Sequence, residues 1–185
     1  MDGRAGRVRI GISGWRYAGW RGVFYLKGLA QRRELEFASR AFDTVEINGT
    51  FYSLQKPKSF AMWERETPGD FVFSLKGSRY ITHLLKLREV KVPLANYFAS
   101  GMLGLGEKLG PVLWQFPPSM RFDRERFESF FRLLPRSTRA AASLARRYAT
   151  RLDDEDGVSV KLDAQLRHCV EIRNESFVVP EFVSL

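Results

Sequence analysis

Five short segments of this 185-residue chain alternate apolar with polar or small side chains, and this pattern strongly restricts the fold. They are 7–13, 42–48, 71–76, 111–116 and 168–173. In a β-strand, residues i and i+2 share a face. Val45 and Ile47 therefore share one face of the second segment, and Glu46 and Asn48 share the other. The pattern predicts five strands, each with one apolar and one polar face.

The stretches between these strands have the periodicity of helices. The predicted helices are 31–40, 57–66, 94–105, 123–134 and a further helix at 137–152. In 123–134, apolar residues recur at i, i+3, i+4 and i+7 from Phe127 to Leu134, as expected of a helix that covers a sheet. Strand–helix–strand units in succession predict a parallel sheet.

The polar face that all five predicted strands share helps to choose between the architectures of the α/β class. A sheet covered by helices on both sides favours two apolar faces, whereas a barrel can hold polar side chains at its mouth. We therefore predict a TIM-type (β/α) barrel as one domain over 1–185, with residues 137–166 as a surface insertion. A five-strand flavodoxin-like sheet is the alternative, although Gly11, Gly14, Gly19 and Gly22 lack the dinucleotide-binding spacing.

In such barrels the functional site lies at the carboxyl ends of the strands. The candidate catalytic residues there are Glu46, Lys76, His83 and Glu171. The candidate substrate-binding residues are Ser13, Trp15, Asn48, Tyr52, Arg79, Gln115 and Arg173. Glu46 and Glu171, on separate strands, suit paired acid–base work if their surroundings separate their pKa values. Alternatively, Lys76 and Arg173 neutralise the two carboxylates in structural ion pairs.

His83 follows the third predicted strand, where a histidine can exchange protons near neutral pH. The alternative is an exposed or structural histidine. With two histidines in the chain and no closely spaced set of ligands, the sequence predicts no metal site and identifies no cofactor. The single cysteine, Cys169, lies beside Val170 in an apolar-leaning run, so we expect a buried thiol in the core.

The charge of the chain allows a second class of function. The net charge is +9, and residues 121–151 hold nine arginines against three acidic residues. Such a stretch attracts phosphates, or simply keeps the helices soluble while the arginine stems cover apolar surface. The aromatic residues of the first loop either stack on bases or sugars, or plug the barrel rim; they are Trp15, Tyr17, Trp20, Phe24 and Tyr25.

Nothing in the sequence indicates export or a membrane. The first ten residues contain no apolar run of the kind that signal peptides carry, and the longest uncharged stretch, 92–106, is too short to span a bilayer. The expected location is the cytoplasm.

Several runs occur in an order that resembles the YecE-like family, known as domain of unknown function 72. They are GISGW at 11–15, WRGVFY at 20–25, TVEIN at 44–48 with TFY at 50–52, KGSR at 76–79 with ITH at 81–83, and GPVLWQFPP at 110–118. VEIR at 170–173 extends the similarity toward the C-terminus. The resemblance implies a TIM-type barrel, and it implies no established reaction.

A full barrel has eight strands in roughly 250 residues, so five strands predict a truncated barrel. Its first and fifth strands would expose unpaired edges, so we expect the chain to self-associate through them, to be unstable, or to form an open partial barrel. The expected function is that of an enzyme acting on a small anionic substrate at the barrel rim, or of an inactive truncated form of it. The alternative is a module that binds nucleic acid or another polyanion through the arginine-rich stretch.

Overall fold

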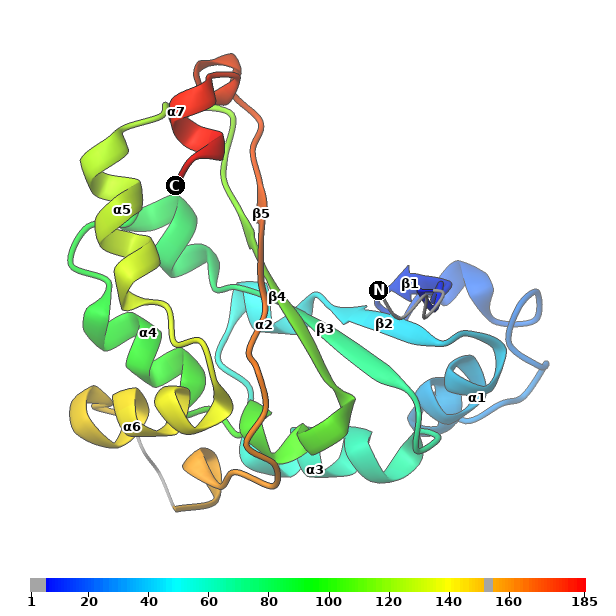
Figure 1. The fold of residues 1–185 in the computed structure, drawn as a ribbon. Helices are drawn as coiled ribbons and strands as arrows, with labels where there is room; N and C mark the ends of the chain where they lie inside the picture. Colours follow the sequence, from blue (N-terminus) through cyan, green and yellow to red (C-terminus); the bar gives the residue numbers. More distant parts are fainter. Residues whose placement is uncertain (1–5, 152–154) are drawn as a thin grey trace.

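The computed structural model describes residues 6–151 and 155–185, and its centre is a five-stranded parallel sheet (Figure 1). The strands are β1 (Gly11–Ser13), β2 (Thr44–Ile47), β3 (Val72–Lys76), β4 (Leu109–Gln115) and β5 (His168–Glu171). They lie in the order β1-β2-β3-β4-β5, and every neighbouring pair is parallel. All five predicted strands are present, although β1 is shorter than the predicted 7–13.

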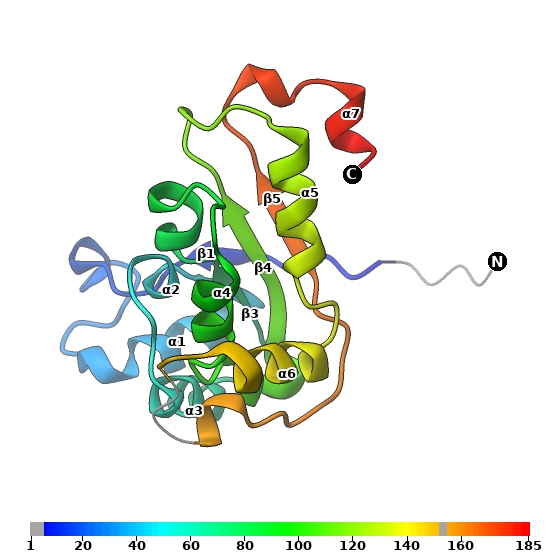
Figure 2. The same ribbon diagram turned by 90° about the vertical axis from the view of Figure 1, so that its left-hand side faces the viewer.

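This sequential order decides between the two predicted architectures. A doubly wound sheet reverses its strand order at a switch point, and no reversal occurs among the described strands, which contradicts the flavodoxin-like alternative. Right-handed crossovers that always step in one direction place their helices on one face. The helices accordingly follow one side of a curved sheet (Figures 1 and 2). β1 and β5 do not pair, so the sheet is open rather than closed into a barrel.

The helices largely follow the predicted ranges. The α-helices are α1 (Glu34–Ala41), α2 (Gly49–Tyr52), α3 (Pro57–Glu66), α4 (Lys91–Phe98), α5 (Arg124–Leu133), α6 (Thr138–Tyr148) and α7 (Pro180–Val183). A π-helical turn, η3 (Tyr80–Leu84), follows β3. The 3₁₀ turns are η1 (Ala18–Trp20), η2 (Gln31–Arg33), η4 (Met102–Lys108), η5 (Glu155–Val158) and η6 (Glu175–Phe177).

Two predicted helices end differently from the expectation. The predicted helix at 94–105 is divided, because Gly101 adopts a left-handed conformation with φ of 102° between α4 and η4. The helix predicted at 137–152 ends at Tyr148, and Leu152 lies outside the described residues. The buried residues Ala141, Ala142 and Ala145 let α6 approach α4 closely.

The core lies between the sheet and its helices. The apolar residues predicted for the covered face are buried in β2, β3 and β4; examples are Ile47, Leu75 and Trp114. Burying a large apolar side chain contributes about 1.5–3 kcal/mol. None of the helices in 6–151 and 155–185 combines the length and the apolarity that crossing a bilayer requires.

The expectation that Cys169 is buried is wrong. The thiol is exposed, because β5 turns His168 toward the helices and Cys169 toward the face of the sheet that no described helix covers. His168 is fixed on the covered side, where Trp114 Nε1 donates a hydrogen bond to its Nδ1 over 3.1 Å. The same alternation that separates Val170 from Glu171 therefore also places Cys169 on the open face.

Candidate functional site

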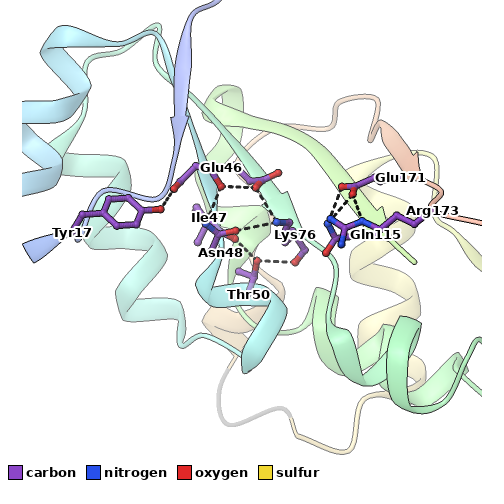
Figure 3. Close-up of polar contacts among 10 residues, drawn as sticks. Tyr17, Glu46, Ile47, Asn48, Thr50, Lys76, Gln115, Glu171 and Arg173 are labelled. Carbon is purple, nitrogen blue, oxygen red and sulfur yellow. Dashed lines mark hydrogen bonds and ion pairs between the residues drawn. The ribbon is translucent and has the colours of Figure 1, made fainter. Parts of the chain in front are cut away.

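Four polar side chains at the carboxyl ends of β1, β2 and β3 form a closed ring of contacts. Ser13 donates a 2.9 Å hydrogen bond to Glu46 Oε1, and Asn48 Nδ2 donates one of 2.9 Å to Ser13 Oγ. Lys76 Nζ lies 3.2 Å from Asn48 Oδ1 and 3.3 Å from Glu46 Oε1. Figure 3 shows the labelled members of this ring turned toward one another. All four residues were predicted as site residues.

The strand pairing positions this polar ring. β1 and β2 align Ser13 opposite Glu46, and β2 and β3 carry Glu46 and Lys76 on the same open face. The side chains of Glu46 and Lys76 are 21% and 18% exposed, so a small molecule can reach them while neighbouring side chains hold them in place. Solvent access combined with an ordered hydrogen-bond network is typical of a binding site.

Two residues that the sequence analysis did not single out support this arrangement from behind. Thr50 Oγ1 lies 2.8 Å from the Ile47 carbonyl oxygen and 2.7 Å from the Lys76 carbonyl oxygen, so it joins the ends of β2 and β3 (Figure 3). Tyr97, from α4, donates a 3.1 Å hydrogen bond to the same Lys76 carbonyl. Burial raises the pKa of Tyr97, which keeps its hydroxyl a donor. The TFY run at 50–52 marks Thr50 in the sequence. Tyr97 lies within a predicted helix, and no local sequence feature distinguishes it from the other residues of that helix.

A pocket of about 630 Å³ adjoins the polar ring. Ser13, Asn48 and Lys76 form its polar side. Its aromatic side consists of Trp15, Tyr17, Tyr52 and Trp63, and Arg16 also lines it. Pockets of this size commonly hold small organic ligands.

The aromatic first loop packs against the fold and also lines the pocket. Trp15 and Tyr25 are buried, and Tyr25 Oη donates a 2.5 Å hydrogen bond to the Trp15 carbonyl oxygen. The rings of Trp15 and Trp63 pack edge to face at 5.5 Å. Tyr17 remains partly exposed and donates a hydrogen bond to the Ser13 carbonyl oxygen. The loop is thus packed against the fold, and it presents aromatic surface to the pocket.

A second polar group lies at the ends of β4 and β5. Gln115 Nε2 is 2.9 Å from both carboxylate oxygens of Glu171, and Arg173 Nε is 2.6 Å from Glu171 Oε1 (Figure 3). Partial burial raises the pKa of Glu171, but the hydrogen bond from Gln115 and the charges of Arg173 and Lys76 outweigh it. The net effect lowers the pKa, so Glu171 is a carboxylate at neutral pH.

The two predicted carboxylates are therefore each matched with a cation. Glu46 pairs with Lys76 and Glu171 pairs with Arg173, as the ion-pair alternative proposed. Lys76 is close enough to act on both carboxylates, since its charge also lowers the pKa of Glu171.

His83 lies at the same end of the sheet, in η3. Its Nδ1 is 2.8 Å from Thr82 Oγ1, and its ring packs edge to face on Phe51 at 5.1 Å. Burial lowers the pKa of His83, and the positive charges of Arg79 and Arg173 lower it further. At neutral pH the imidazole is uncharged.

The remaining predicted site residues are more peripheral. Arg79 is exposed just before η3, and Tyr52 is 68% exposed at the end of α2, where its ring contacts Phe51. Across 6–151 and 155–185, no group of three or more His, Cys, Asp or Glu side chains comes together as metal ligands.

Comparisons with known proteins agree on one family. Residues 9–185 match the model of the family described as "Protein of unknown function DUF72". The UPF0759 protein YunF of Bacillus subtilis is 30% identical over 122 residues, which cover 60% of this chain and 40% of that protein. The UPF0759 protein YecE of Escherichia coli K12 is 31% identical over 110 residues, covering 60% and 38%. The chain thus spans about two fifths of the length of these relatives.

Two solved structures share the fold. A DUF72 family protein from Thermotoga maritima superposes with a TM-score of 0.66 at 24% identity, over 95% of this chain and 59% of that one. A DUF72 family protein from Enterococcus faecalis gives a TM-score of 0.58 at 17% identity, over 95% and 54%. At these identities the likeness concerns the fold alone.

Proposed function

Because the chain belongs to the DUF72 family, whose description names no reaction, we propose its function from the geometry of the site. It is an enzyme that binds a small anionic molecule at the carboxyl ends of the strands and exchanges a proton with it through Glu46. The observation that carries this proposal is the polar ring of Ser13, Glu46, Asn48 and Lys76. Ser13, Asn48 and Lys76 of this ring line a pocket of about 630 Å³, and Glu46 contacts Ser13 and Lys76 from beside it.

The ring provides the parts that such a reaction needs. The ammonium group of Lys76 attracts an anion, and a bound anion competes with Glu46 for that charge. Glu46 is then free to accept a proton from the substrate, while Ser13 and Asn48 hold its orientation. A carboxylate within hydrogen-bonding reach of the reacting atom contributes roughly 10²–10⁴-fold to such a step. The aromatic side of the pocket covers the apolar part of the ligand.

We propose that the five strands correspond to part of a (β/α) barrel, in which the polar face is the interior. The sequential strand order, the helices on one side and the polar open face support this reading. In barrels of this class the reactive groups lie at the carboxyl ends of the strands, where this ring lies.

The polyanion-binding alternative has less support. Four arginines of the basic stretch 121–151 pair with acidic side chains: Arg124, Arg126, Arg132 and Arg139. Their charges are therefore partly neutralised within the fold, and exposed pairs of this kind are further weakened by salt.

The test is a thermal-shift screen of the purified chain with inorganic phosphate, phosphomonoesters and small carboxylates. Compounds that raise Tm are then followed by NMR for chemical conversion. We expect Lys76→Met to abolish the shift, and Glu46→Gln to keep binding but lower turnover by roughly 10²-fold or more. Glu125→Gln is the matched control, because Glu125 is exposed on α5, remote from β1–β3. Binding that survives Lys76→Met, or full turnover by Glu46→Gln, contradicts the proposal.

A further inference from the structure

The first loop brings a second cation to the pocket beside the polar ring. Arg16 and Lys76 are the two cationic side chains among the described residues that line this pocket, and no aspartate or glutamate is among them. Lys76 belongs to the polar ring, whereas the proposed reaction gives no role to Arg16. The pocket therefore carries a positive charge beyond that of the polar ring.

Hydrogen bonds hold the chain on both sides of Arg16. Trp15, which precedes it, is buried, and its carbonyl oxygen accepts a 2.5 Å hydrogen bond from Tyr25 Oη. Tyr17, which follows it, donates a hydrogen bond from its hydroxyl to the Ser13 carbonyl oxygen (Figure 3). The loop thus presents Arg16 from a defined position, which reduces the ordering cost of binding a ligand through it.

The guanidinium group of Arg16 is not occupied by the protein itself. Among residues 6–151 and 155–185, its side chain makes no ion pair and no hydrogen bond. Burial raises the pKa of Glu66, and the charge of Arg16 opposes this from a distance without forming an ion pair. Arg21 in the same loop differs, because its Nε lies 2.7 Å from Oε1 of the buried Glu34. Arg16 therefore keeps its donors available for a ligand.

The charges around the pocket indicate how much negative charge it accepts. Arg16 and Lys76 carry two positive charges, and Glu46, 3.3 Å from Lys76 Nζ, carries one negative charge. In the proposed function Glu46 accepts a proton and becomes neutral. Two negative charges on the ligand then balance the two cations. Such opposite charges attract one another more strongly in a partly buried pocket than in water.

Aromatic surface lies beside Arg16 in the wall of the pocket. Trp15 and Tyr17 flank it in the sequence and also line the pocket, and Trp63 packs edge to face on Trp15 with 5.5 Å between the ring centroids. The hydrogen bond of Tyr17 to Ser13 brings this aromatic surface up to the polar ring. Aromatic rings pack well against one another in offset and edge-to-face arrangements. A ligand with an aromatic body fits this wall.

We infer that Arg16 is a second anion-binding residue of the pocket, and that the ligand is an aromatic dicarboxylate. Lys76 holds one carboxylate at the polar ring, and the planar guanidinium of Arg16 holds the other through parallel hydrogen bonds. The identification of this ligand as a substrate rests on the proposed function, whereas its binding does not. Two separate cationic side chains match two separate anionic groups better than one doubly charged phosphate.

The test is an NMR titration of the purified chain with benzoate and the three benzenedicarboxylates at constant ionic strength. The indole signals of Trp15 and Trp63 report on the pocket, and that of Trp114, which does not line it, is the internal reference. We expect at least one dicarboxylate to bind about tenfold or more tightly than benzoate, since it adds a charge-assisted contact. In Arg16→Gln the affinities for this dicarboxylate and for benzoate should become nearly equal.

Arg32→Gln is the matched control, because Arg32 is exposed in η2, does not line the pocket, and has no ion pair or side-chain hydrogen bond in the described parts of the chain. This variant loses the same charge and should keep the preference for the dicarboxylate. The inference fails if no dicarboxylate binds more tightly than benzoate, or if Arg16→Gln keeps the preference. Equal loss of the preference in Arg32→Gln also overturns it.

A further titration with phenyl phosphate separates two acidic groups from one doubly charged group. Phenyl phosphate that binds as tightly as the best dicarboxylate, and depends equally on Arg16, replaces the dicarboxylate and overturns the inference. The results also distinguish this inference from the proposed function. A preference that depends on Arg16, without conversion of any compound, keeps the second anion-binding residue and removes the enzyme. Conversion of a monocarboxylate that depends on Glu46, without any preference for dicarboxylates, keeps the enzyme and removes the inference.

Discussion

At the scale of single residues, Trp114 determines the environment of two neighbours. It is fully buried in β4, packs against Phe130 of α5 at 5.2 Å, and donates to His168. A Cβ atom on Gly77 would lie 2.2 Å from Trp114 Cε3. Glycine at position 77 therefore allows the indole to fill the space directly behind the end of β3, where Lys76 enters the polar ring.

We predict that Gly77→Ala destabilises the protein, because the added methyl group overlaps the Trp114 ring. Overpacking of a core typically costs about 1–3 kcal/mol of unfolding free energy. Urea denaturation followed by circular dichroism measures this difference. Gly104→Ala is the control, since no atom lies within 4 Å of its added Cβ. Equal stability of Gly77→Ala and the parent chain would contradict the packing described here.

His168 makes the stability depend on pH. Burial lowers the pKa of His168 from 6.5, and the charge of Arg136 also lowers it. The hydrogen bond between Nε2 and the Pro135 carbonyl oxygen raises the pKa, but the net shift is downward. Protonation of His168 would add a hydrogen at Nδ1, so that two N–H donors, those of His168 and Trp114, would face each other. The folded state thus binds the proton less readily than the unfolded state, so stability is complete above about pH 6.5 and decreases as the pH falls.

We therefore expect the urea midpoint to decrease between about pH 7.5 and pH 5.5, and His168→Gln to reduce this dependence strongly. His83→Gln is the matched comparison. His83 also has a lowered pKa, but its ring is less buried and opposes no N–H donor, so its contribution is smaller. A pH dependence unchanged by His168→Gln would contradict the assignment.

At the scale of elements, side chains just outside the helices satisfy backbone groups at their ends. Asp123 accepts from the Arg126 amide at the start of α5, and Ser137 accepts from the Ala140 amide at the start of α6, each over 3.1 Å. At the C-terminal end of α3, the buried Lys108 ammonium donates hydrogen bonds to the carbonyl oxygens of Glu64 and Thr67. These contacts stabilise the starts of α5 and α6 and the C-terminal end of α3.

We predict that Ser137→Ala lowers the unfolding free energy by about 1 kcal/mol, the usual effect of losing a helix cap. Ser129→Ala in the middle of α5 is the matched control, because Ser129 is exposed and caps nothing. Its stability should stay within about 0.5 kcal/mol of the parent chain. Thermal and urea unfolding of both variants measure the difference, and equal effects would show that the cap is not the cause.

At the scale of the whole molecule, the sheet has two open edges. β1 pairs only with β2 and β5 pairs only with β4 among the described strands. Unpaired strand edges are templates for another chain. We propose that the isolated chain self-associates through these edges.

Light scattering over a dilution series, under reducing conditions that exclude disulfides of the exposed Cys169, should therefore give a mass that rises with concentration. Ile10→Lys, beside β1, should reduce association, because a charge on an edge opposes pairing. Val23→Lys is the control, since Val23 is exposed in the first loop, outside the strands. A monomer at all concentrations would contradict the proposal.

The sequence by itself determined which segments are strands, which helices lie between them, and which face of each strand is polar. These are local properties: the alternation of Val45, Glu46 and Ile47 is a consequence of strand geometry and needs no knowledge of neighbours. The ordered motifs also indicated the DUF72 family, which the family model confirms.

Only the tertiary structure decided which side chains meet. The contacts of Ser13 with Asn48, and of Lys76 with Glu46, depend on strand register, which places residues far apart in the sequence beside one another. Cys169 makes the same point, because residue type suggested a buried thiol, whereas the uncovered face on which it lies exists only in the assembled sheet.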